Sequence, residues 1–252
     1  QDVYLTGNPQ ITFFKVVYRR HTNFSKEAIK QEWNGSGTSK TCTLARNGDL
    51  VQEMYLTGSS MQHSDSTSVE VEIGGQKIDK HYGTWLDIYD DLFDTNRDLK
   101  NAIAGSFMPL RFWFNRNPGL ALPLIALQYH EVKVVAEFSA NASNYTSLLV
   151  NYLYLDTDER RRFAQVSHEY LIEQVQHTGA ESIAAAGAKS ITLTFNHPVK
   201  ALFWNGLSAD AATGVASYTA KLQLNGHDRF SEQSNMYFTG VQPYESGLKH
   251  TL

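Results

Sequence analysis

Residues 107–138 read FMPLRFWFNRNPGLALPLIALQYHEVKVVAEF, and this stretch decides the fold class. Turn-forming residues interrupt it at Asn117-Pro118-Gly119 and again at Pro123. Before the first turn, Leu110–Phe114 alternates two phenylalanines with an arginine and a tryptophan, and after the second, Val132–Phe138 begins with the same period of two. Alternation of this kind predicts half-buried β-strands. A chain organised around such segments is a β-sandwich or a β-barrel rather than a helical enzyme.

The composition agrees with a β protein and excludes several classes. The 252 residues suffice for one large β domain or two smaller ones. Thirteen tyrosines, thirteen phenylalanines and four tryptophans favour pleated surfaces, on which aromatic pairs stabilise neighbouring strands. A net charge of −4 argues against a coat that neutralises nucleic-acid phosphates directly. Cys42 is the only cysteine, which excludes a disulfide within the chain and a cysteine-based zinc site. Neither a long apolar run nor the basic and apolar regions of a signal peptide are visible, so we expect no membrane span and no signal peptide.

Further strands are predicted from alternating or β-branched runs between turn signals. In the first half they span residues 11–18, 28–33, 40–45, 50–56, 69–73 and 76–78. In the second half they span residues 148–155, 170–177, 190–195, 199–204 and 220–224. A small polar run, SANASNYTS at 139–147, separates the two groups. We therefore expect a first domain over residues 1–140, a linker over 141–147 and a second domain over 148–252.

One segment has the period of a helix instead. The apolar residues at helical spacing are Trp85, Ile88, Tyr89, Leu92 and Phe93. They lie on one face of a short predicted helix. The acidic residues Asp87, Asp90 and Asp91 are expected on its exposed side. The pattern leaves open whether the apolar face contacts the core or another subunit.

Two hairpins resemble one another on either side of the expected linker. Residues 69–79 (VEVEIGGQKID) and 220–230 (AKLQLNGHDRF) each place an alternating strand before a glycine-containing turn and a polar return. Each hairpin comes late in its own run of strands, which favours two related units. After Gly226 only residues 227–252 remain, with no counterpart to residues 107–138. We therefore expect the second unit to lack its closing strands.

Long blocks of sequence, in order and spread along the chain, resemble one family specifically. They are YLTGNPQITFFKVVYRRHTNFS (Tyr4–Ser25), VEIGGQKIDKHYG (Val71–Gly83), LRFWFNRNPGLALPLIALQYHEVKV (Leu110–Val134), LDTDERRRFAQVSHEYLIEQ (Leu155–Gln174), FNHPVKALFW (Phe195–Trp204) and KLQLNGHDRFSE (Lys221–Glu232). Through these blocks the chain resembles the major capsid proteins of large nucleocytoplasmic DNA viruses, including phycodnaviruses and iridoviruses.

The resemblance implies an all-β fold, a tandem double jelly roll made of two antiparallel β-sandwiches. It implies that three copies form a homotrimer of pseudo-hexagonal outline, and that such capsomers tile an icosahedral virus shell. The expected partners are neighbouring capsomers and minor capsid proteins, with an inner membrane beneath the shell. The implied location is the outer capsid shell of the virion, after assembly in the host cytoplasm. No enzymatic activity, no cofactor, no metal ion and no direct contact with nucleic acid are expected.

The main candidate for a chemical site is the charged run Asp156–Arg162. Its spacing lacks the glycine and the terminal glutamate of a calcium loop. Its three arginines lack the surrounding basic and aromatic residues of a nucleic-acid site. We therefore interpret the run as a charged corner whose groups pair with one another or across a subunit contact. The nine histidines are scattered, and neither HExxH nor GxSxG nor a phosphate-binding glycine motif is present.

Two further sets of residues are candidates for modification or assembly. Asn-x-Ser/Thr sequons begin at the candidate glycosylation sites Asn23, Asn34, Asn141 and Asn144. The candidate subunit contacts are Leu120, Leu122, Leu124, Arg160, Arg161 and Arg162. The leucines belong to residues 118–127 (PGLALPLIAL), which are too apolar for an exposed loop and form either a subunit contact or a buried strand.

The alternative function is a carbohydrate-binding β-sandwich module. Such a module needs exposed aromatic rings that stack on sugars, whereas several aromatic residues here alternate with core positions, which favours the capsid hypothesis. A cupin-type enzyme would need clustered histidine and carboxylate ligands, which the spacing does not supply.

Overall fold

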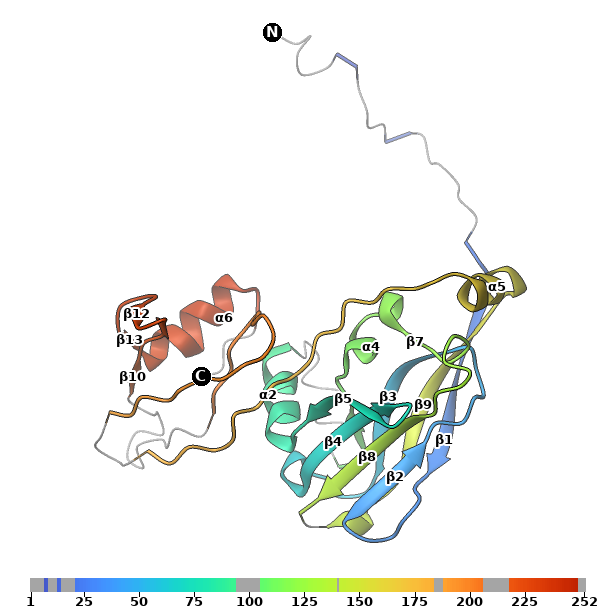
Figure 1. Cartoon of the computed structure of the whole chain (residues 1–252), viewed down its shortest axis with the longest axis horizontal. Helices are drawn as coiled ribbons and strands as arrows, with labels where there is room; N and C mark the ends of the chain where they lie inside the picture. Colours follow the sequence, from blue (N-terminus) through green and yellow to red (C-terminus); the bar gives the residue numbers. More distant parts are fainter. Residues whose placement is uncertain are drawn as a thin grey trace.

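The computed structural model of the chain describes residues 7–8, 13–14, 21–93, 105–139, 141–183, 188–205 and 218–248. Most of the regular structure lies in one β-sandwich, beside which the second half of the chain extends as long loops and a few short elements (Figure 1). Of the strand predicted at 11–18 only residues 13–14 are described, so this prediction lies outside the described part. No helix within the described ranges is long and apolar enough to cross a membrane.

Two antiparallel sheets form the sandwich. The first contains, in spatial order, β1 (Phe24–Glu32), β9 (Tyr145–Leu155), β3 (Leu50–Gly58) and β6 (Phe107–Pro109), and β7 (Leu122–Pro123) also pairs with β3. The second contains β2 (Ser39–Thr43), β8 (Val132–Phe138), β4 (Ser66–Ile73) and β5 (Gln76–His81). Successive strands mostly alternate between the sheets, and the first strand pairs with the last. This order is that of a jelly roll, in which Greek keys close a sandwich.

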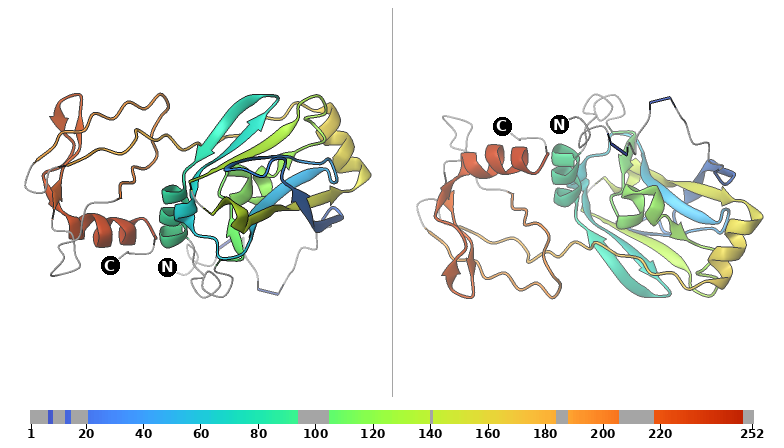
Figure 2. Two further views of the ribbon diagram at one scale, coloured as in Figure 1. Left: turned by 90° about the horizontal axis from the view of Figure 1, so that it is seen from below. Right: turned by 90° about the horizontal axis from the view of Figure 1, so that it is seen from above.

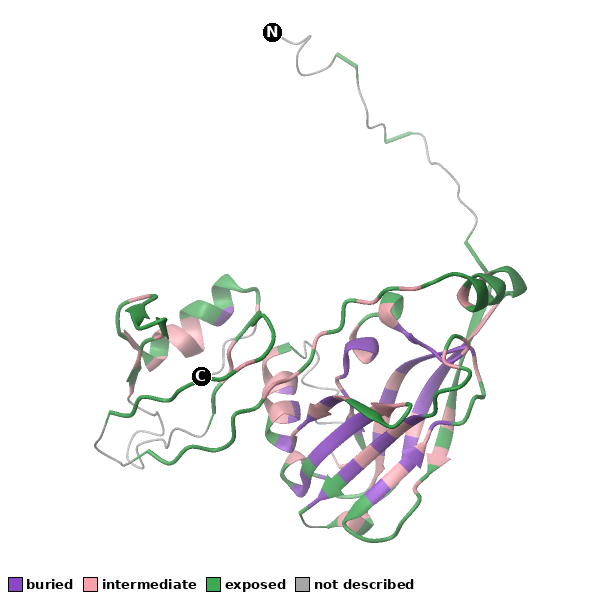
Figure 3. Cartoon of the chain, viewed as in Figure 1, coloured by how far each residue is buried: buried purple, intermediate pink, exposed green. Residues whose placement is uncertain are grey.

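The inner faces of the two sheets meet in one hydrophobic core. Val69 and Val71 of β4 lie opposite Ala136 and Val134 of β8, and all four are fully buried. The period of two in the sequence produces this arrangement, because successive side chains of a strand point to opposite faces of its sheet. Figure 3 shows the buried residues concentrated on the strands of the sandwich. The first unit therefore carries its own core.

The structure corrects the strand predicted at Leu110–Phe114. The chain there turns into the short helix α4 (Trp113–Arg116). The buried aromatic side chains at this point are the consecutive Phe112, Trp113 and Phe114. A half-buried strand would expose every second one of these rings. A turn that buries all three is therefore more stable here than a strand. Asn115 stabilises this turn, because its side chain accepts a hydrogen bond from the Phe112 N–H and donates one to the Gln52 carbonyl.

The structure also moves the domain boundary. The predicted linker at 141–147 contains the short 3-10 turn η3 (Ala142–Asn144) and the start of β9. β9 pairs with β1 on one side and with β3 on the other, so it is a central strand of the first sandwich. The linker prediction is wrong because the small polar run is a loop between two strands of the same unit. The first jelly roll ends at Leu155 and includes residues 148–155, which the sequence assigned to the second domain.

Beyond β9 the chain forms helix α5 (Thr157–Gln165) and then runs to residue 205 without strand pairing among its described residues. The strands predicted at 170–177, 190–195 and 199–204 are therefore wrong for this structure. Their apolar side chains stay exposed, 81% for Leu171 and 41% for Leu193. A strand is stable only where a neighbour pairs its backbone and another layer covers its apolar face.

The repeated hairpin is present in both halves. β4 and β5 connect through Gly74 and Gly75, whose φ angles are +59° and +80°. β11 (Gln223–Leu224) and β12 (His227–Asp228) connect through Asn225 and Gly226, whose φ angles are +51° and +80°. Two successive positive φ angles are typical of the type I′ hairpin turn. The elements that accompany the hairpins are α2 (Gly83–Phe93) in the first half, and β10 (Thr219–Ala220), β13 (Gln233–Ser234), the π-helical turn η4 (Tyr237–Val241) and α6 (Gln242–Glu245) in the second.

Candidate interaction surface

Helix α2 lies on the side of the sandwich that faces the second half of the chain (Figure 2). The structure confirms this predicted helix but changes which of its residues are inside. The residues that it buries are Gly83, Leu86 and Asp90. The predicted apolar stripe, which includes Trp85 and Tyr89, is only half-buried. The expectation that Asp90 lies on the exposed side is wrong, because its carboxylate is paired within the molecule.

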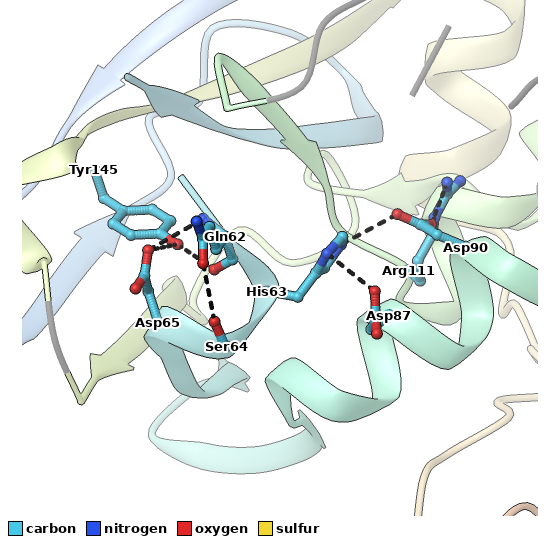
Figure 4. Close-up of polar contacts among 8 residues, drawn as sticks. All are labelled: Gln62, His63, Ser64, Asp65, Asp87, Asp90, Arg111 and Tyr145. Atoms are coloured by element: carbon cyan, nitrogen blue, oxygen red, sulfur yellow. Dashed lines mark hydrogen bonds and ion pairs between the residues drawn. The ribbon is translucent and has the colours of Figure 1, made fainter. Parts of the chain in front are cut away.

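Asp90 is the centre of a polar network (Figure 4). Its Oδ1 accepts hydrogen bonds from Arg111 Nε at 2.9 Å and from Arg111 Nη2 at 2.7 Å. Its Oδ2 lies 3.2 Å from His63 Nε2, and Oδ1 of Asp87 lies 3.5 Å from the other ring nitrogen of His63. The network joins α2 to the 3-10 turn η1 (His63–Asp65) on one side and to the loop before α4 on the other.

The pKa of Asp90 shows which influence dominates in this network. Burial raises the pKa of the carboxyl, but the hydrogen bonds and charges of His63 and Arg111 outweigh that effect and hold the pKa below its ordinary value. Asp90 is therefore ionised at neutral pH. A buried ion pair of this kind contributes little when intact, but losing one partner leaves the other charge unpaired and is costly.

A second polar node fixes the opposite end of η1. The Tyr145 hydroxyl donates to the Gln62 carbonyl at 2.7 Å. Asp65 accepts hydrogen bonds from the Gln62 N–H at 3.1 Å and from Asn141 Nδ2 at 2.9 Å. Burial, with the nearby Asp65 carboxylate, raises the pKa of Tyr145, which keeps its hydroxyl protonated as a donor. The turn that holds His63 is thus anchored to β9.

Close backbone contact fixes the start of α2. A Cβ atom at Gly83 would lie 2.1 Å from the His63 carbonyl oxygen and 2.4 Å from that of Ser66. These neighbours are backbone atoms, so they cannot move aside by changing rotamer. Only glycine lets the helix approach η1 this closely.

Taken together, these contacts fix the position of α2 against the sandwich. Within the described ranges no three His, Cys, Asp or Glu side chains converge as metal ligands. Burial, with the Glu32 carboxylate, raises the pKa of the Cys42 thiol to about 11, so the thiol is protonated at neutral pH. The Asp90 network holds α2 in place, with its aromatic stripe half-buried on the side away from the sandwich core.

The four sequons fall into two pairs. Asn23 and Asn34 are exposed, and their side-chain amides make no hydrogen bond within the described residues. Asn141 donates from Nδ2 to Asp65, and Asn144 donates from Nδ2 to the Ser60 carbonyl at 3.3 Å. A glycan is attached through this same nitrogen, so modification at the second pair would disturb these hydrogen bonds.

The candidate leucine contacts are mostly interior. Leu122 and Leu124 are buried, with exposed fractions of 4% and 3%, and Leu120 packs partly buried against the same core. Leu122 belongs to β7, which pairs with β3. Both side chains therefore lie inside this chain, Leu122 in strand β7 and Leu124 in the turn that follows it, and their role as subunit contacts stays a prediction.

The candidate arginines lie on α5. Asp156 caps this helix by accepting from the Thr157 N–H, and acidic residues in the first turn with Arg162 in the last complement the helix dipole. Arg160 pairs with Asp49 at 3.0 Å, and Arg161 lies 3.9 Å from Asp158. Arg160 and Arg161 thus have partners within the chain, while their side chains remain 57% and 63% exposed.

Sequence reasoning missed the pairing of Asp90 with Arg111. No local pattern joins them, because they are 21 residues apart. One signal was available: Gly83, Leu86 and Asp90 are spaced three and four residues apart, which defines a helical face of their own. An acidic residue on that face required a partner from elsewhere in the chain.

Comparison with known proteins agrees with the strand order. The family described as "Major capsid protein N-terminus" matches residues 12–160. The family described as "Large eukaryotic DNA virus major capsid protein" matches residues 159–220. The two matches meet at α5, just after the last strand of the first jelly roll.

Individual relatives and solved structures lead to the same family. The chain is 49% identical to the major capsid protein of Pyramimonas orientalis virus, over 97% of this chain and 73% of that protein. It is 42% identical to the major capsid protein of Paramecium bursaria Chlorella virus 1, over 98% of this chain and 75% of that protein. A quasi-atomic model of the PBCV-1 virus capsid covers 92% of this chain and 76% of its own, at 37% identity and a TM-score of 0.71. This likeness and the antiparallel sheets confirm the all-β fold of double-jelly-roll type, and the chain belongs to the family of major capsid proteins of large eukaryotic DNA viruses.

Proposed function

We propose that this chain is a major capsid protein, a structural subunit of the outer shell of a virion. The observation that carries the proposal is the agreement, along nearly the whole chain, with proteins of that name in both sequence and fold. The subunit works by shape and self-association, and we infer no enzymatic activity, cofactor or metal ion for it.

The proposed assembly is a homotrimer with a pseudo-hexagonal outline. Such capsomers contact one another and minor capsid proteins, tile an icosahedral shell above an inner membrane, and assemble in the host cytoplasm. Exposed apolar side chains of the second half, such as Leu171, Trp204 and Tyr244, suit contacts with other subunits. The net charge of −4 supports a shell that does not touch nucleic acid directly.

We propose two units for the chain, with the boundary near α5 rather than at 141–147. Residues 24–155 contain the strands of the first jelly roll that the structure describes. Among the sequons, the exposed Asn23 and Asn34 are the better candidates for glycosylation. Among the candidate contacts, Arg160, Arg161 and Arg162 are the better candidates for pairing across subunits, because α5 is exposed.

The mass in solution, together with electron microscopy, tests the proposed function. One chain has a mass of 28.4 kDa, so a trimer has about 85 kDa and should show a hexagonal outline. A stable monomer that binds an oligosaccharide would instead support the carbohydrate-binding alternative. The burial of Phe112, Trp113 and Phe114 argues against that alternative, since buried rings cannot stack on sugars.

A further inference from the structure

A cluster of aromatic and charged side chains joins α2 to the second half of the chain. We propose that this cluster is a docking surface that holds the second unit in a fixed orientation against the first within one subunit. The contacts belong to the single chain, and only their consequence for the capsomer rests on the proposed function.

Tyr89 is the centre of the docking surface. The guanidinium carbons of Arg111 and Arg116 lie 5.2 and 5.1 Å from the centre of its ring. Arg116 also donates from Nε to the backbone carbonyl of Arg111 at 2.8 Å, which fixes the Arg116 side chain relative to the Arg111 backbone. Cations over an aromatic face are attracted to the ring, but the two like charges repel each other. Each arginine therefore needs a carboxylate of its own.

The second half supplies one of these carboxylates. Arg111 is neutralised by Asp90 of α2, from the first unit. Arg116 instead pairs with Glu173 of the second half, Nη1 to Oε2, at 3.1 Å. Lys200 binds the other oxygen of Glu173, so this side chain bridges the first unit and a more distant part of the second. Among the described residues, the carboxylate that pairs with Arg116 of the first unit thus comes from the second half.

Aromatic contacts extend the docking surface along α2. Phe203 of the second half lies edge-on to Trp85, with ring centres 5.2 Å apart, and 6.1 Å from the ring centre of Phe93. Tyr89 stacks on Phe93 at 4.5 Å, so the stripe forms one continuous aromatic surface. The half-buried stripe predicted from the sequence is therefore covered in part by the chain's own second half.

The free edge of β5 provides a third contact. The Val175 N–H donates to Asp79 Oδ1 at 3.1 Å, and the Gln174 side chain donates to the Ile78 carbonyl. His177 packs against Tyr82, with ring centres 4.4 Å apart. Residues 174–177 thus run along an edge strand and cover it, which is one way in which proteins protect exposed edges. Ionic, aromatic and edge contacts coincide on one side of the sandwich.

The consequence concerns the geometry of the capsomer. In the proposed trimer, a hexagonal outline requires the two units of each subunit to keep a constant angle. A long unpaired connection after α5 would not enforce that angle by itself. The docking surface supplies the constraint, through side chains anchored by the His63–Asp90–Arg111 network.

Hydrogen exchange on the full chain tests the proposal. The variant is Glu173→Gln, and its matched control is Glu169→Gln, the same change at an exposed glutamate four residues earlier. In Glu173→Gln, exchange of the peptide covering residues 171–177 should rise about five- to tenfold, as expected for losing charge-assisted hydrogen bonds at a locally opening segment. In Glu169→Gln it should stay within about twofold of the wild type, and exchange of β8 should not change in either variant. Phe203→Ala should raise exchange in the same peptide through the aromatic contacts.

Three outcomes would overturn the proposal. The first is equal hydrogen exchange of residues 171–177 in Glu173→Gln and Glu169→Gln, and the second is a rise in the exchange of β8 that parallels theirs. The third is a protection of residues 171–177 that depends on protein concentration, because the contact would then lie between two copies of the chain. A chain that forms no trimer but shows selective deprotection in Glu173→Gln would retain the docking surface and refute only the proposed function. A trimer in which Glu173→Gln leaves the exchange of residues 171–177 unchanged would support the proposed function and refute the docking surface.

Discussion

Replacing Asp90 with alanine should destabilise the first jelly roll far more than replacing its neighbour Asp87. Asp90 is buried and accepts two hydrogen bonds from Arg111, at 2.9 and 2.7 Å, whereas the Asp87 side chain is 51% exposed and lies 3.5 Å from His63. Breaking one partner of a buried ion pair costs about 3–5 kcal/mol. The side chains of Arg111 and His63 are 23% and 19% exposed, so water would partly solvate the groups left behind. We therefore expect a loss of about 2–4 kcal/mol.

The measurement is thermal and urea unfolding followed by intrinsic fluorescence. For a domain of this size the expected loss lowers Tm by about 5–12 °C. Asp87→Ala should change the free energy of unfolding by about 0.5 kcal/mol or less, as for an exposed pair. In a double-mutant cycle, Arg111→Ala should cost less in the Asp90→Ala background than in the wild type, with a coupling energy of about 1.5–3 kcal/mol. Equal losses in Asp90→Ala and Asp87→Ala, or additive effects in the cycle, would refute the network as an anchor of α2.

Three further predictions follow from individual positions. Gly83→Ala should lower the free energy of unfolding by about 2–3 kcal/mol or more, because the new Cβ would meet two backbone carbonyls. Gly37→Ala, whose Cβ would have no atom within 4 Å, should be nearly neutral in the same unfolding assay. Gly75→Val should lower the free energy of unfolding by about 1–3 kcal/mol and reduce the yield of folded protein, because valine is strained at the φ of +80° that Gly75 has in the hairpin turn. Normal yield and stability of this variant would contradict the prediction. The stability advantage of the wild type over Asp90→Asn should be full above the ordinary carboxyl pKa of 3.8 and should be lost as pH falls through the lower pKa of the folded state. Stability falls with pH because the Asp90 carboxyl of the unfolded chain takes up a proton near the ordinary pKa of 3.8, whereas in the folded chain it does so only at lower pH. Unfolding of the wild type and of Asp90→Asn, measured across this acid range, checks the prediction.

Local features of this protein were readable from the sequence because neighbouring residues set them. The alternation at 69–73 and 132–138 predicts strands β4 and β8, since side chains of a strand point to alternate faces. The helix predicted at 85–93 exists as the main part of α2, since its apolar residues recur at helical spacing. Gly74-Gly75 and Asn225-Gly226 mark hairpin turns because few residues tolerate positive φ. Ordered blocks of resemblance indicated the family, which the comparisons confirm.

Contacts between distant residues were decided only by the tertiary structure. Residues 148–155 belong to the first jelly roll because β9 pairs with β1 and β3, which both lie far earlier in the chain. A polar loop before a strand does not reveal the partners of that strand. Leu110–Phe114 is not a strand because the core receives three consecutive aromatic rings there. Asp90 is inside because Arg111 is present to neutralise it. Short-range geometry follows from the order of residues, whereas pairing, burial and charge compensation depend on which distant segments the fold brings together.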